Sequence, residues 1–91
     1  MKSKSLIKQP TSKVLRAGRV ILAPREDVGE HSTKNCEEMI IVIHGTATLI
    51  LEGLTAQVKQ GDTYFINAGV KHNIRNKTTD IVEYVYVMGQ F

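Results

Sequence analysis

The sequence of 91 residues predicts a single all-β domain, folded as a sandwich or a barrel. Short segments rich in β-branched residues recur along the chain, and turn residues such as Gly, Asn and Asp separate them. No stretch has the apolar spacing of an amphipathic helix. A chain of this length builds only a modest core, so association between copies is an expected aid to stability.

The expected strands follow one another at a steady spacing, and two of them carry most of the argument. Residues 39–43 are a continuous apolar run, which predicts a strand buried on both faces. A small barrel buries one face of this strand, so we expect a second subunit to cover the other face in a homodimer. Residues 46–51 and 54–59 should pair as a hairpin. Further strands are expected at residues 14–18, 19–23, 28–31, 63–66, 72–76 and 81–88.

Charge and composition restrict the partners and the location. The first 13 residues hold four lysines and no acidic residue, so the rest of this +3 chain carries −1 and offers no basic patch for nucleic acid. No apolar run approaches the ~20 residues of a membrane helix, and the start lacks a secretory apolar region. One cysteine excludes an intrachain disulfide. We expect a cytoplasmic protein in which residues 1–12 are a flexible or partner-ordered tail and residues 13–91 form the barrel.

Two distant stretches carry the candidate site. His31 and Thr33 would share one face of a strand, Glu38 opens the next strand, and His72 follows a turn at Gly69. If the strands wrap into a barrel, these side chains converge. Two imidazoles and one carboxylate with open positions suit iron, manganese, nickel or zinc. Burying Glu38 without a cation or a donor would be costly.

These residues also carry a resemblance. His31, Glu38 and Gly45 keep the spacing of the first cupin motif, and Gly61, Gly69, His72 and Asn76 keep that of the second, so the chain resembles a small single-domain cupin. The resemblance implies a double-stranded β-helix, or jelly-roll, barrel with one divalent metal ion on His31, Glu38 and His72.

The sequence departs from the family pattern at two positions. Thr33 replaces the second histidine of the first motif and Asn67 replaces a proline. Threonine is a poor ligand, so the family's set of four is reduced to three.

Other residues have structural alternatives to a role in the site. The Thr33 hydroxyl could hold a metal-bound water or a substrate oxygen. On an extended strand, Cys36 would lie on the same face as Glu38, near the pocket mouth. There it is either a replacement ligand or a small apolar filler. Tyr84 and Tyr86 share one face of the last strand and either line the pocket or fill the barrel. We expect Asn76 to fix a turn or a strand end by bonds to the backbone.

Three functions remain open from the sequence. The first is a metal-binding cupin with a pocket for a small molecule, with or without dioxygenase- or isomerase-like catalysis. The second is a non-catalytic module that binds or senses a small ligand. The third is a metal-free isomerase- or epimerase-like cupin in which a histidine is the base and a tyrosine the acid. The catalytic residues are not assigned.

Overall fold

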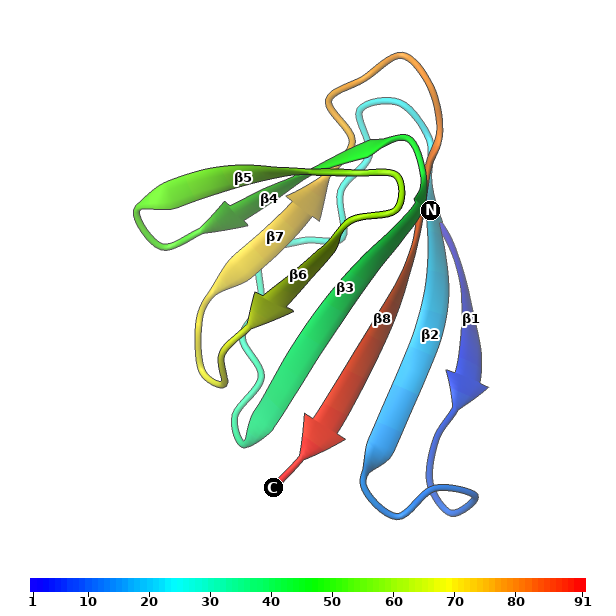
Figure 1. The fold of residues 1–91 in the computed structure, drawn as a ribbon, viewed down its shortest axis with the longest axis vertical. Helices are drawn as coiled ribbons and strands as arrows, with labels where there is room; N and C mark the ends of the chain where they lie inside the picture. Colours follow the sequence, from blue (N-terminus) through cyan, green and yellow to red (C-terminus); the bar gives the residue numbers. More distant parts are fainter.

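The computed structural model describes residues 1–91 as eight β-strands in two antiparallel sheets (Figure 1). The larger sheet has the order β1-β2-β8-β3-β6, and the smaller has the order β5-β4-β7. The structure contains no helix with the length and hydropathy that a membrane span requires. The strands are β1 (Lys2–Ile7), β2 (Leu15–Leu22), β3 (Cys36–His44), β4 (Thr46–Leu51), β5 (Leu54–Lys59), β6 (Thr63–Ile66), β7 (His72–Arg75) and β8 (Val82–Gln90).

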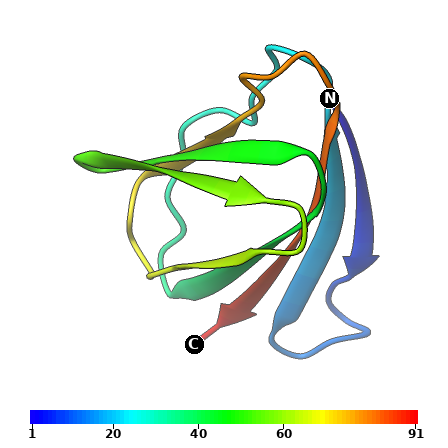
Figure 2. The same cartoon turned by 45° about the horizontal axis from the view of Figure 1, so that its top comes forward.

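The two sheets face one another, as the turned view shows (Figure 2). The chain passes from the larger to the smaller sheet between β3 and β4, at Gly45. This glycine has φ +82°, and a Cβ atom there would lie 2.5 Å from the carbonyl oxygen of Ile81, so only glycine fits the crossing. The expected hairpin of β4 and β5 is confirmed. The arrangement is the all-β jelly-roll that the sequence predicts.

The core lies between the sheets and is built from alternate residues of each strand. In β3, Ile40 and Val42 are buried, whereas Met39 and Ile43 point outward and are 37% and 47% exposed. Within one chain, the run 39–43 is therefore buried on one face only. The same alternation brings Glu38 to the inner face, beside the core.

The N-terminal segment extends the larger sheet. Residues 2–7, expected to be flexible or ordered by a partner, form β1 and pair with β2 of the same chain. The division into a tail of residues 1–12 and a barrel of residues 13–91 stays a prediction. The two short strands expected at residues 14–23 are one strand, β2, and residues 28–31 contribute only an isolated bridge at His31.

Asn76 fixes the loop between β7 and β8, as the sequence indicates. Its buried side chain donates hydrogen bonds to the carbonyl oxygens of Leu22 (3.0 Å) and Asp80 (2.7 Å). Its Oδ1 atom accepts bonds from the backbone N–H (2.9 Å) and the hydroxyl (2.6 Å) of Thr78. One amide thus joins the end of β2 to the loop that leads into β8.

Candidate metal centre

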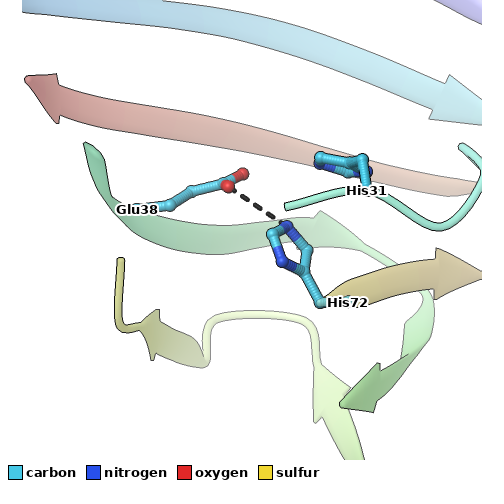
Figure 3. Close-up of side chains that lie close together, drawn as sticks. All are labelled: His31, Glu38 and His72. Carbon is cyan, nitrogen blue, oxygen red and sulfur yellow. Dashed lines mark ion pairs between the residues drawn. The ribbon is translucent and has the colours of Figure 1, made fainter. Parts of the chain in front are cut away.

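Three side chains from separate parts of the chain, those of His31, Glu38 and His72, lie close together (Figure 3). Glu38 comes from β3, His72 opens β7, and His31 lies in the connection between β2 and β3. One ligand atom from each lies within 4.8 Å of the others. The structure therefore brings together the three residues that the sequence singles out.

The backbone sets the distance between the two histidines. The N–H of His31 donates to the carbonyl of His72, and the N–H of His72 donates to the carbonyl of His31, both at 2.9 Å. The ring centroids are 4.3 Å apart, with an angle of 60° between the planes. This two-bond bridge holds the two imidazoles in contact, one ring edge-on to the other.

Both histidines have the same ring nitrogen engaged. The Nδ1 atom of His31 lies 3.0 Å from the carbonyl oxygen of Gly29, and the Nδ1 atom of His72 lies 2.9 Å from that of Val70. Because a carbonyl oxygen only accepts, each Nδ1 carries the proton and donates it. The neutral rings then present an Nε2 lone pair, and a hydrogen bond at the other nitrogen is how proteins orient a metal-binding histidine.

The pair formed by Glu38 and His72 is buried and lacks a balancing group. Their side chains are 5% and 0% exposed, and the Oε1 and Nε2 atoms are 3.3 Å apart. Neither atom has a hydrogen-bond partner. With Nδ1 already donating, Nε2 of the neutral ring is an acceptor facing an acceptor. The contact is favourable only when a proton or a cation lies between the two atoms.

The pKa of His72 reflects this demand for positive charge. The close Glu38 carboxylate raises the pKa of His72 above its ordinary value, burial opposes the rise, and the Val70 carbonyl adds to it. The residues fit a divalent ion, because two imidazole nitrogens and one carboxylate oxygen form a donor set that manganese, iron, nickel and zinc accept. His31 is exposed and gives the cluster access to solvent.

A cavity of 270 Å³ opens onto this cluster. Thr33 lines it, together with His31 and Glu38. Cys36 is buried and is not among the lining residues, so it is placed here as a small core side chain. The complete lining is Met1, Ser3, Val20, Val28, His31, Thr33, Glu38, Ile74, Tyr84, Tyr86 and Met88.

Tyr84 and Tyr86 line the cavity from β8. Tyr84 is 2% exposed, and its burial, together with the charge of Glu38, raises its pKa, so its phenol stays neutral and protonated. Five apolar lining residues were not singled out in the sequence, namely Met1, Val20, Val28, Ile74 and Met88. Val20 pairs with Tyr84 across β2 and β8. Knowledge of this register, which joins strands far apart in the sequence, would have identified Val20 as a cavity residue.

The fold and the cluster define a class of protein, a small β jelly-roll that carries a His–Glu–His group. The family model described as the cupin domain matches residues 18–88, so the chain belongs to the cupin family. No curated protein matches the chain.

Solved structures share the fold at low sequence identity. A predicted oxalate decarboxylase from Thermotoga maritima is 23% identical with a TM-score of 0.90, over 98% of this chain and 79% of that one. A Cupin 2 conserved barrel domain protein from Salinispora arenicola is 23% identical with a TM-score of 0.86, over 98% and 75%. The cupin domain of Schizosaccharomyces pombe Cnp3 is 17% identical with a TM-score of 0.88, and the alignment covers 98% of this chain and 64% of that one. These likenesses concern the fold.

Proposed function

We propose that this chain is a metal-binding cupin that holds a small molecule in the cavity above its metal ion. His31, Glu38 and His72 are the proposed ligands of one iron, manganese, nickel or zinc ion. One observation carries the proposal. The buried Oε1 atom of Glu38 and the buried Nε2 atom of His72 face one another at 3.3 Å without a hydrogen-bond partner.

The protein residues have separate tasks in this proposal. Glu38 supplies the negative charge that makes the site selective for a cation, and the carbonyls of Gly29 and Val70 keep the two imidazoles in the ligating tautomer. When bound, the ion supplies a Lewis acid that polarises an oxygen atom of the small molecule. Thr33 and Tyr84 line the cavity with neutral hydroxyls that can bond to the same molecule.

The test is the metal content of protein purified without a histidine tag and without chelator, measured by mass spectrometry. Near-stoichiometric metal is expected in the wild type, with nearly complete loss in His72→Ala. His44→Ala is the matched control, because His44 lies away from the cluster and pairs with Asp80 at the surface (3.0 Å). Equal metal in the wild type and His72→Ala would contradict the proposed ligands.

A metal-free result would have a specific meaning. If the wild type stays free of metal after incubation with iron, manganese, nickel and zinc, the positive charge between Glu38 and His72 is a proton. The metal-binding function is then wrong, and the site is a buried carboxylate–imidazolium pair. The ring-proton resonances of His72 in NMR spectra would show that state directly.

We also propose that the outer face of the larger sheet joins two copies of the chain in a homodimer. Met39 pairs with Phe65 on one side and with Val87 on the other, so their outward side chains form an apolar row. Met39 and Phe65 are 37% and 46% exposed. Sedimentation equilibrium should show a dimer that Met39→Lys dissociates, whereas a monomeric wild type would contradict the proposal.

A further inference from the structure

Charge is distributed unevenly in the cavity. Among the side chains that line it, only His31 and Glu38 are acidic or basic, and both belong to the metal cluster. No lysine or arginine side chain lines the cavity. Met1 lies at its edge, and its amino group is paired with Glu26 at 2.6 Å. The polar groups away from the cluster are neutral hydroxyls.

The rest of the lining is mostly apolar. Val20 and Ile74 are almost fully buried, Val28 also lines the cavity, and Met88 lies beside Glu38, its cross-strand partner. The volume of 270 Å³ lies at the lower end of ligand pockets, which start near about 300 Å³. A molecule in this space therefore has one polar end at the cluster and an uncharged remainder.

We infer that the cavity selects a compact amphiphilic molecule, with a single oxygen-bearing head at His31 and Glu38, the cluster residues that line it, and an uncharged apolar body about the size of one ring. The inference rests on the proposed function, because the head faces the proposed metal ligands. It excludes phosphorylated compounds, sugars and dicarboxylates as ligands.

The exclusion follows from desolvation. A second charged group on the ligand would have to leave water and lie against Val20, Val28 and Ile74, where no opposite charge compensates it. A polyhydroxyl ligand would bring more hydrogen-bonding groups than the few hydroxyls of the wall can satisfy. An apolar ring instead gains free energy when these side chains cover it.

Three matched probes separate the requirements for ring and charge. Acetohydroxamate has the oxygen head alone, benzohydroxamate adds a ring, and 4-carboxybenzohydroxamate adds a carboxylate at the far end of that ring. Dissociation constants would be measured by NMR titration of the ¹⁵N-labelled protein, with and without added zinc. Benzohydroxamate should bind at least about tenfold more tightly than either of the others. Shifted amide resonances should include those of Ile74, Tyr84 and Met88.

A variant tests whether the lack of a cation away from the cluster sets this preference. Ser3→Lys places a cation at an exposed lining position on β1, and β2 and β8 lie between this strand and the strand of Glu38. It should tighten the binding of 4-carboxybenzohydroxamate by about tenfold or more. Leu6→Lys adds the same charge on the same strand at an exposed position outside the cavity, and should change nothing.

The outcomes separate this inference from the proposed function. Metal content is measured on the same samples. A metal-loaded protein that binds the carboxylated probe as tightly as benzohydroxamate, or gains nothing from the ring, overturns the inference alone. A protein that takes up no metal but keeps the preference for the uncharged ring overturns the metal site alone. Absence of benzohydroxamate binding in both states overturns the inference.

Discussion

His31 and His72 exchange two backbone hydrogen bonds of 2.9 Å, so the two imidazoles of the candidate site are positioned by the main chain. The bridge joins the connection before β3 to the first residue of β7, and it brings the ring centroids to 4.3 Å. Side-chain bonds to Gly29 and Val70 then fix both rings. A site supported in this way is preorganised before any ligand arrives.

The stability of the metal-free protein should fall as the pH rises. Glu38 raises the pKa of His72, so folding favours the protonated imidazole. This contribution to the free energy of unfolding is complete below the unfolded pKa of about 6.5, and it is lost as the pH rises through the higher folded pKa. Thermal unfolding of the wild type and of His72→Gln, compared at a series of pH values, measures the contribution as a difference.

Metal should reverse this pH dependence. A divalent ion and a proton compete for Nε2 of His72, so the affinity for zinc should rise with pH through the same interval. The assignment of a protonated His72 beside Glu38 in the metal-free protein would be contradicted by one result. In that result, the free energy of unfolding of the wild type, relative to that of His72→Gln, rises with pH.

Thr33→His should strengthen metal binding. The substitution places a third imidazole two residues after His31, in a side chain that lines the same cavity. A fourth protein ligand should raise the affinity for zinc or nickel by at least about tenfold, measured by competition with a chelating dye. Thr33→Val is the control that removes the hydroxyl without adding a ligand. A folded Thr33→His variant with unchanged affinity would show that position 33 does not face the ion.

Asn76→Ala should destabilise the fold without touching the ligands. The variant removes the partners of the Leu22 and Asp80 carbonyls and of Thr78. Loss of such buried bonds should cost about 3 kcal/mol in the free energy of unfolding, measured by urea denaturation. Asn76→Asp keeps the acceptor and should lose less. A cost below about 0.5 kcal/mol for Asn76→Ala would mean that the amide does not hold the loop.

Gly18→Ala should displace the ring of Tyr86. A Cβ atom on Gly18 would lie 2.5 Å from the Tyr86 hydroxyl, so the ring must move, and it lines the cavity. We expect a loss of about 1–3 kcal/mol in the free energy of unfolding. Gly89→Ala is the matched control, because no atom lies within 4 Å of its added Cβ. Equal effects of the two substitutions would contradict the close packing of Tyr86 on Gly18.

The sequence predicts those strands whose own residues alternate, and it fails where a strand depends on its neighbour. The hairpin of β4 and β5 is of the first kind. β1 is polar and lysine-rich, and its extended form comes from pairing with β2. Gly18 suggested a break between two strands, yet it lies within β2, where it makes room for Tyr86.

The candidate site divides in the same way. Motif spacing singles out His31, Glu38 and His72, because the family pattern fixes their positions along the chain. The apolar wall depends on which face of β2 and β8 turns inward, and a shift of one residue in the register would exchange the faces. The pairing of Val20 with Tyr84 settles this in three dimensions, and no local pattern encodes it.

Anomalous X-ray diffraction from a zinc-loaded crystal, recorded on both sides of the zinc absorption edge, tests the metal centre most directly. We predict one strong peak within about 2.0–2.2 Å of the Nε2 atoms of His31 and His72 and of a carboxylate oxygen of Glu38. A peak elsewhere, or a fully occupied zinc ion that Glu38 does not touch, would contradict the account.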